Sequence, residues 1–490
     1  MPERDSNVLT NVLVVMTAVC LPLFFNGEGY GGIEMAKCLF LMYIFYALFI
    51  GTLVCAVRGL VSHSRPFGKY RFDMLDVAIL FYMAFSLISC FVSTDFRASL
   101  LGYGRCCGTW GHICGGLSYF WISRNCKVSR KVLYFTVIVW LMISLWSFAN
   151  AFGVNLFGLY DGLKPEQAVG FVSCLGHFNA ASAFFCLTVP FVAVLFIKGG
   201  SVLESFLYGI ALFFGMLASL SICVDGMWFG FLLATAFVAA WAMADSGRHC
   251  RMWRAALVLA AAIVLFRILL DLDFVHRDES ESVFLAEHWA GEILTVVSIL
   301  MLLILHHRPN LTVPYSVRRF VSIGILALFA VILLYTFFLG FENPFFGTTR
   351  GAVWKGSVWS YRLYSPTEKI FGLGNGCYYD KLSIAVNMLL GRPFKKMDYF
   401  ACHNSLLQAL LAQGVLGLIA LLAGIFALFR KAIAFHKELF FDKSFPAFVA
   451  IVAYLGQSMV NSTYTLTVMM MFLMLAFFRG NLIRENREFL

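Results

Sequence analysis

The chain is built from long apolar runs that short polar or charged segments separate. A transmembrane helix needs about 20 apolar residues to cross a hydrocarbon core about 30 Å thick. Fourteen runs approach this length, and we interpret each as a transmembrane helix. They are Val8 to Phe25, Ala36 to Val57, Met74 to Val92, Thr109 to Ile122, Val132 to Gly153, Ala180 to Ile197, Ser205 to Cys223, Met227 to Ala244, Ala255 to Leu270, Trp289 to Leu305, Phe320 to Gly340, His403 to Phe429, Phe445 to Val460 and Tyr464 to Phe478.

Lysine and arginine gather in alternate connections between these runs, which predicts an orientation. Short cytoplasmic loops of membrane proteins carry an excess of both residues. The cation-rich connections contain Arg58, Arg124, Arg248, Arg308 and Arg430, and the tail carries Arg479. Both termini are therefore predicted to be cytoplasmic. The first run lacks the layout of a cleavable signal peptide, so we expect it to be retained as a helix. The membrane is expected to be a bacterial plasma membrane.

The composition excludes most soluble classes. Hydrophobic residues make up 61% of the chain and charged residues 13%, whereas soluble proteins have about 45–50% and about 25%. The net charge of +10 is spread over loop clusters rather than one face, so it indicates topology and not nucleic-acid binding. The predicted fold is an all-α polytopic membrane protein with about 14 transmembrane helices and one large extracytoplasmic loop.

That loop, residues 341–402, is far longer than most other connections. It is rich in Trp and Tyr, and it contains Arg350, Arg362 and several lysines. Long loops that are not disordered are usually functional. The predicted organisation is transmembrane helices in residues 1–340, the loop in 341–402, and three further helices with a cytoplasmic tail in 403–490. A cationic, aromatic loop over the outer leaflet is suited to a polyanionic, sugar-bearing ligand.

Motifs for common cofactors are absent from the sequence. There is no GxxxxGK followed by Ser or Thr for ATP, no HExxH for zinc, and no GxGxxG that opens a βαβ unit. Asp271-Leu272-Asp273 formally resembles a metal-nucleotide motif, but it is predicted at the extracytoplasmic end of a helix, where sugar nucleotides are absent. We therefore expect no nucleotide-driven chemistry.

The polar start of the twelfth run is the strongest candidate for chemistry. His403 lies at the predicted outer boundary, where an imidazole can act as a base or as a hydrogen-bond donor to a sugar. The structural alternative is an interfacial residue that caps the helix together with Asn404.

The segment from His403 to Gln408, followed by Gly414 and Gly417, resembles the signature of the O-antigen ligase/polymerase family of integral-membrane glycosyltransferases. Three upstream segments share the order found in that family, and the resemblance covers about Ser93 to Gly480. These segments are Arg350 and Trp354 with Ile370 to Gly374, Val169 to Asn179 with Pro190, and Leu101 and Gly102 with Arg105 and Gly108.

The resemblance implies a GT-C-like protein that moves a glycan from an isoprenoid diphosphate to an acceptor hydroxyl at the outer face of the membrane. The acceptor is a glycan, a lipid or a protein hydroxyl, and neither a metal nor another cofactor is expected. Arginine is suited to the leaving group because its guanidinium binds phosphate oxygens in a bidentate manner. The implied catalytic residues are Arg350 and His403, and the implied substrate-binding residues are Arg105, Arg362, Trp354, Asn404 and Gln408.

One position departs from the family pattern. Where many members have an arginine at the outer end of a middle helix, this chain has Asp225, which puts the donor contacts in doubt. Arg267 compensates for the missing cation, or it pairs with Asp271 for structural reasons. Two other classes stay open. One is a transporter or flippase for the same lipid, although the two halves show no internal repeat, and the other is a non-catalytic scaffold. Polymerase, ligase and protein O-glycosylating activities also stay open.

Overall fold

The structure is a computed structural model of the 490-residue chain. It describes residues 2–61, 72–102, 107–125, 127–275, 280–393, 399–435 and 443–487. Helices dominate these residues, and the one sheet pairs two strands of two residues each. The predicted all-α class is therefore confirmed.

The elements follow one another along the chain with short connections. The helices are α1 (Pro2–Val15), η1 (Met16–Cys20), α2 (Leu21–Leu23), η2 (Gly29–Gly31), α3 (Ile33–Val61), α4 (Met74–Val92), α5 (Phe96–Leu101), α6 (Thr109–Arg124), α7 (Arg130–Ala149), η3 (Asn150–Phe152), η4 (Leu156–Gly158), α8 (Pro165–Ala168), η5 (Ser173–Leu175), α9 (Phe178–Lys198), α10 (Val202–Ser221), α11 (Gly226–Ala242), α12 (Ser246–Asp271), α13 (Glu281–Glu287), α14 (Ala290–His307), α15 (Tyr315–Glu342), α16 (Phe346–Arg362), α17 (Pro366–Phe371), α18 (Tyr379–Leu389), α19 (Ser405–Phe435), α20 (Phe445–Ser458) and α21 (Thr465–Arg487). The strands are β1 (Phe171–Val172) and β2 (Gly176–His177).

Ten helices in the described residues are long and apolar enough to cross a membrane. They are α3, α4, α7 with η3, α9, α10, α12, α14, α15, α19 and α21. Three further apolar segments are shorter, namely Asn7–Leu23, Gly226–Ala242 and Phe445–Ser458. The chain is thus a multi-pass membrane protein, while the count of fourteen spans stays a prediction.

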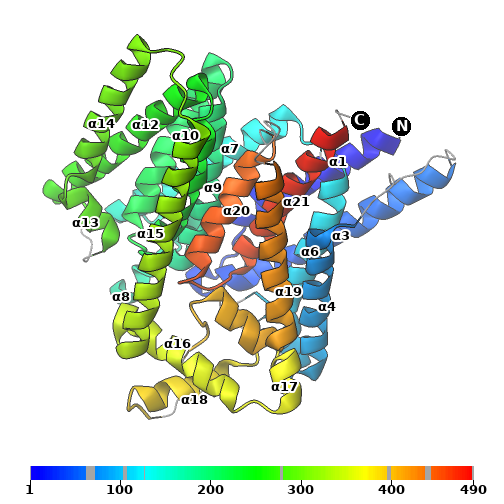
Figure 1. The fold of residues 1–490 in the computed structure, drawn as a ribbon. Helices are drawn as coiled ribbons and strands as arrows, with labels where there is room; N and C mark the ends of the chain where they lie inside the picture. The colour runs from blue at the N-terminus through cyan, green and yellow to red at the C-terminus, as the bar shows by residue number, and fades with distance from the viewer. Residues whose placement is uncertain are drawn as a thin grey trace.

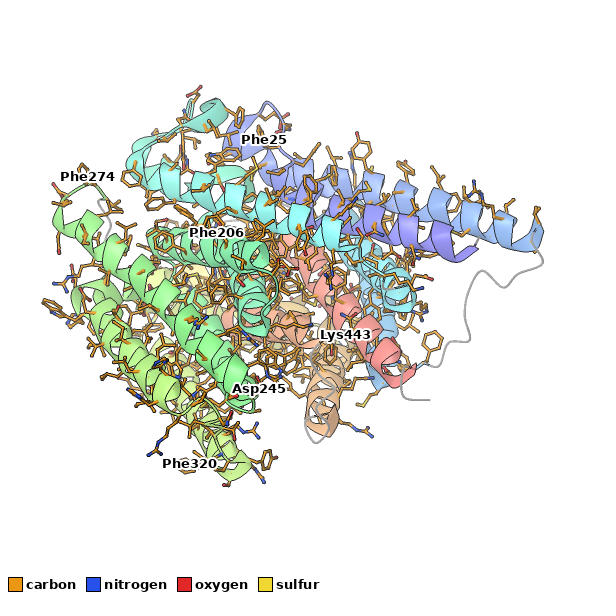
Figure 2. All side chains as sticks on the ribbon, turned by 90° about the horizontal axis from the view of Figure 1, so that it is seen from above. Phe25, Phe206, Asp245, Phe274, Phe320 and Lys443 are labelled. Atoms are coloured by element: carbon orange, nitrogen blue, oxygen red, sulfur yellow. The ribbon has the colours of Figure 1, made fainter. Side chains whose placement is uncertain are left out.

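The bundle exposes apolar side chains on its outer surface. Phe274 and Phe320 lie at the edge of the molecule when it is viewed from above (Figure 2), and they are 60% and 78% exposed. In contrast, α9 and α20 are buried at the centre, where α20 packs against α9 and α11. An apolar outer surface around a packed centre is the arrangement expected of helices that face lipid.

Both termini lie at one end of the bundle, and α16, α17 and α18 lie at the opposite end (Figure 1). We call these three helices the cap, and we name the two ends the cap end and the termini end. The cap has a hydrophobic core of its own around Val353, Tyr378 and Leu382, to which Leu411 of α19 also contributes. The described residues of the cap thus pack as a unit, while the extracytoplasmic position of the segment stays a prediction.

Glycines attach the cap to a kink in α19. The backbone N–H groups of Leu373 and Gly374 donate to the carbonyls of Leu411 and Ala412, at 3.1 and 2.8 Å. Gly414 has φ of +68°, and a Cβ on it would lie 2.3 Å from the carbonyl oxygen of Ile370. Only glycine readily adopts this conformation. Two segments that the resemblance singled out, around Gly374 and Gly414, thus meet in space.

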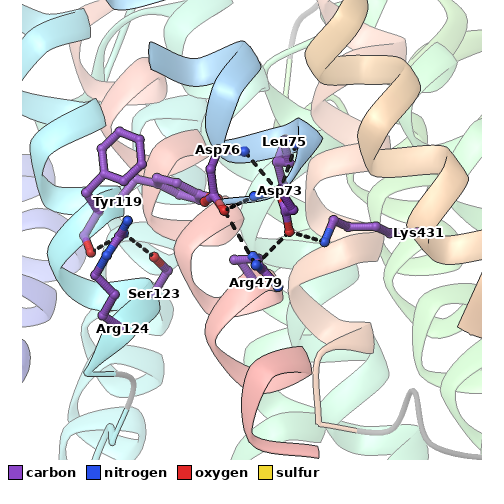
Figure 3. A network of polar contacts seen from close by, with 9 residues as sticks. Asp73, Leu75, Asp76, Tyr119, Ser123, Arg124, Lys431 and Arg479 are labelled. Carbon is purple, nitrogen blue, oxygen red and sulfur yellow. Dashed lines mark hydrogen bonds and ion pairs between the residues drawn. The ribbon is translucent and has the colours of Figure 1, made fainter. Parts of the chain in front are cut away.

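Charged side chains fasten four helices together at the termini end (Figure 3). Tyr119 donates to Asp76 at 2.6 Å, Arg479 pairs with Asp73 at 2.7 Å, and Lys431 also pairs with Asp73. Asp76 is fully buried, and it lies 3.4 Å from the same nitrogen of Arg479. We call Asp73, Asp76, Tyr119, Lys431 and Arg479 the paired cluster. It joins α4, α6, α19 and α21.

Candidate functional site

Arg350 lies at the cap end, directly after a strained turn. The three residues before it, Gly347, Thr348 and Thr349, have φ of +56°, +57° and +74°. Positive φ is unfavourable for threonine because its side chain is branched at Cβ. Such strain persists only where the surrounding structure enforces it, and it concentrates at functional sites. The turn places Arg350 in the first regular turn of α16.

The Arg350 guanidinium faces acidic and aromatic groups from three other segments. Asp225 lies at the start of α11, Glu281 at the start of α13 and Tyr464 before α21, and their charges favour the protonated arginine. Burial nevertheless lowers the pKa of Arg350 below its ordinary value. No described residue forms a hydrogen bond or ion pair with its guanidinium. Its donors are thus available to an anionic ligand.

Asp225 and Glu281 form an acidic pair beside this arginine. The backbone N–H of Glu281 donates to Oδ1 of Asp225 at 3.1 Å. Partial burial of the Glu281 carboxyl, together with the neighbouring Asp225 carboxyl, raises the pKa of Glu281 to about 8. Near neutral pH the pair therefore carries about one negative charge, because two adjacent carboxylates do not readily ionise together. We call Asp225, Glu281 and Arg350 the open cluster.

Hydrogen bonds hold the backbone of His403 to α16 and to the connection before α21. Its N–H donates to Oγ of Ser462 at 3.0 Å, and its carbonyl accepts from Nε1 of Trp354 at 3.1 Å. Its φ of +47° is unfavourable for a residue other than glycine. Trp354 follows Arg350 by four residues on α16, so the two side chains share a helix face. Arg350 and His403 are thus linked by one helical turn and one hydrogen bond.

A chain of hydrogen bonds continues from His403 into the centre of the bundle. Ser462 N–H donates to Asn461 Oδ1 at 2.8 Å, and Asn461 Nδ2 donates to the carbonyl of Asn179 at 3.2 Å. His177, directly before α9, stacks on Tyr464 with ring centroids 6.3 Å apart. These contacts connect the starts of α9 and α19 and the connection before α21 to one another.

Trp354, Asn404 and Gln408 lie near this site as supporting residues. Trp354 is fully buried between α15 and α16, so contact of its ring with a substrate would require a rearrangement. Asn404 caps α19, since its Oδ1 accepts from the N–H groups of Leu406 and Leu407, both at 2.9 Å. Gln408 Oε1 accepts from Thr463 N–H at 3.3 Å. The three residues position the backbone around His403, and their predicted substrate contacts stay predictions.

The other predicted cations are not gathered at Arg350. Arg362 is exposed and follows Arg350 by twelve residues on α16, which places the two about 18 Å apart along the helix axis. Arg105 lies outside the described residues. Arg267 pairs with Glu292 at 2.9 Å and Asp271 at 3.6 Å, and it stacks on Trp289 at 3.7 Å. The pairing of Arg267 with Asp271 is therefore confirmed, and with Glu292 and Trp289 it accounts for the position of this arginine.

Sequence reasoning missed Glu281, Tyr464 and His177 as neighbours of the site. Asp225 was noticed only as a departure from a family pattern. The polar run Asn461-Ser462-Thr463 between two apolar helices was the one local signal for this region. The positive φ values at His403 and Thr348 could not be read from residue types, because neither residue favours them.

Comparison with models of known protein families finds no match, and comparison with curated protein sequences finds no similar one. The function therefore has to be inferred from the geometry of the site.

Proposed function

We propose that this protein is a membrane glycosyltransferase. It moves a glycan from an isoprenoid-diphosphate donor to an acceptor hydroxyl, as a polysaccharide polymerase or an O-antigen-type ligase does. The cap end faces the outside of a bacterial plasma membrane in this proposal, in agreement with the cation-rich connections at the termini end. Neither a metal nor a cofactor takes part.

The observation that carries the proposal is that the Arg350 guanidinium forms no hydrogen bond or ion pair with a described residue. A half-buried guanidinium whose donors form no hydrogen bond or ion pair with a described residue is unfavourable unless a ligand accepts from them. A diphosphate supplies such acceptors, and its oxygens match the geometry of the guanidinium. The strained turn before Arg350 fixes the direction of these donors before the ligand arrives.

The chemistry needs a charge-stabilising group and a proton acceptor. The acceptor hydroxyl oxygen attacks the anomeric carbon of the donor, and the bond from this carbon to the diphosphate oxygen breaks. The electron pair goes to the diphosphate, where Arg350 stabilises it, and the hydroxyl proton goes to a base. His403 is the proposed base because two hydrogen bonds fix its backbone, one from Trp354 of α16 and one to Ser462 before α21. A preorganised donor such as the proposed Arg350 guanidinium lowers the barrier by about 2.7–4 kcal/mol.

The test is deletion of the gene, followed by extraction of the isoprenoid-linked glycans and analysis by mass spectrometry and gel. Accumulation of single repeat units indicates a polymerase, and accumulation of long lipid-linked chains indicates a ligase. Donor trapped on the cytoplasmic side indicates a flippase, and an unchanged glycan pool contradicts any role in this chemistry.

Complementation connects the result to the site. The gene with Arg350→Ala or His403→Ala is expected to leave the deletion phenotype, whereas Arg362→Ala is expected to restore the wild-type pool. Protein abundance in the membrane is measured in each strain, because only variants that are present in normal amount are informative.

A further inference from the structure

A long cavity runs through the bundle from the candidate site toward the termini end. It contains about 980 Å³ of space that atoms do not fill, part of it open to the surroundings. Its walls come from α4, α6, α19, α20 and α21. Ser405, Gln408 and Thr463 line it at the cap end, within the segments that hold His403.

The cavity reaches from the start of α19 to the start of α4 near the termini end. Beyond the kink at Gly414, α19 lines it as far as Leu428, fourteen residues on, which is about 21 Å along this part of the helix. Leu75 lines its far end and lies beside Asp73 and Asp76 of the paired cluster (Figure 3). A hydrocarbon core is about 30 Å thick, so a fatty acyl chain of one leaflet reaches only about half of this distance.

The chemistry of the walls selects an apolar chain. Among the described residues that line the cavity, there is no lysine, arginine, aspartate or glutamate. The hydrogen-bonding groups are concentrated toward the cap end, where Gln413 Nε2 donates to Ser86 Oγ at 2.7 Å and Asn375 donates to Thr109 at 3.0 Å. Beyond them the wall is largely apolar and includes Gly424, where a Cβ would lie 3.8 Å from the Cβ of Ala78.

We propose that this cavity binds the polyprenyl chain of the lipid substrate and extends it into the opposite leaflet. The inference rests on the proposed function, because the head of the same lipid lies at Arg350. It adds a property of that substrate, namely that the protein distinguishes a polyprenyl chain longer than one leaflet from ordinary acyl chains. An uncharged wall also gives a diphosphate no path across the membrane.

Photo-crosslinking of the full chain in lipid nanodiscs tests the proposal. The probes are undecaprenyl diphosphate and farnesyl diphosphate, each with a diazirine at the end farthest from the diphosphate, and a phospholipid with a diazirine at the end of one acyl chain. We expect the undecaprenyl probe to label Leu75, Leu428 or their neighbours, and the farnesyl probe to label residues near Gln408. Undecaprenyl label confined to the outer, lipid-facing surface overturns the proposal. Equal labelling of Leu75 and Leu428 by the phospholipid probe also overturns it.

A variant pair tests the depth of the cavity. Gly424→Phe introduces a ring at a position that lines the cavity opposite Ala78, whereas Leu422→Phe changes a residue of the same helix that is 45% exposed. Burial of two methylene groups is worth about tenfold in affinity, so Gly424→Phe is expected to weaken retention of undecaprenyl diphosphate at least about tenfold. Retention of farnesyl diphosphate, and both affinities in Leu422→Phe, are expected to stay within about twofold of wild type.

The two proposals fail in different ways. Label at Leu75 or Leu428 without any glycan transfer keeps the cavity and rejects the transferase. Transfer with no dependence on chain length rejects the cavity and keeps the transferase. If Gly424→Phe does not fold, the positions of label in the wild-type protein decide the question alone.

Discussion

The two charged clusters at opposite ends of the bundle differ in whether their cations have an ion-pair partner. In the paired cluster, Lys431 and Arg479 each have a carboxylate partner within 4 Å. In the open cluster, Arg350 faces Asp225 and Glu281 but forms no ion pair with a described residue. Buried charges that serve the fold are normally paired. An arginine that the fold holds in a strained segment without a partner is therefore the better candidate for ligand binding.

The largest expected effect on stability comes from a substitution in the paired cluster. Asp76→Ala removes the fully buried carboxylate that accepts from Tyr119 and faces Arg479, and the loss of both charged contacts is expected to lower the free energy of unfolding by about 3–5 kcal/mol. Asp225→Asn in the open cluster keeps a side-chain oxygen that accepts from the Glu281 N–H. This variant is expected to change the free energy of unfolding by less than about 1 kcal/mol. Thermal unfolding in detergent measures both variants. Equal losses would remove the distinction between the clusters.

Loss of Arg350 is expected to act on activity and not on stability. Arg350→Ala should lower the transfer rate by about 10²–10³-fold, the effect of removing one preorganised donor. Its unfolding temperature should be no lower than that of wild type, because no ion pair is lost. Arg350→Lys should recover only part of the rate, since lysine cannot bind phosphate in a bidentate manner. A rate within threefold of wild type in Arg350→Ala would show that the guanidinium has no catalytic role.

Gly414→Ala tests whether the close contact at Gly414 holds the cap against α19. The Cβ would collide with the Ile370 carbonyl and would adopt φ of +68°, so a destabilisation of about 1–3 kcal/mol is expected. Gly324→Ala is the matched control, because nothing lies within 4 Å of a Cβ at that position of α15. Proteolysis of the cap should become faster in Gly414→Ala alone. Similar proteolysis of both variants would contradict the docking role.

The smallest expected effect is on pH dependence. The pKa of Glu281 is raised to about 8, so this carboxyl is neutral below that pH and ionised above it. The new negative charge attracts Arg350 and repels a diphosphate, so donor affinity should fall as the pH rises from 7 to 9. Glu281 is exposed, and such a contact contributes about 0.2–1 kcal/mol, which predicts a change of up to about fivefold. Titration of Glu281→Gln should give a flat profile, and an unchanged slope would exclude Glu281 as its source.

Hydrophobic patterning predicted the helical class and the positions of most long helices, because lipid imposes a simple length rule. The family resemblance suggested Arg350 and His403 as site residues, and the structure connects them through Trp354, while their catalytic roles stay predictions. It did not predict their acidic neighbours, since Asp225 and Glu281 are 56 residues apart and meet only through the packing of α11 and α13. Arg362 was expected to help Arg350, but a straight helix separates the two. The fixed rise of α16 could have excluded that pairing from the sequence.

The most direct measurement is the affinity of the purified protein in nanodiscs for undecaprenyl diphosphate, in wild type and in Arg350→Ala. If Arg350 is reserved for the diphosphate, the variant should bind at least about tenfold more weakly, which corresponds to about 1.4 kcal/mol. Binding of undecaprenol, which lacks the phosphates, should be the same in both proteins. Equal diphosphate affinity in the two proteins would contradict the account.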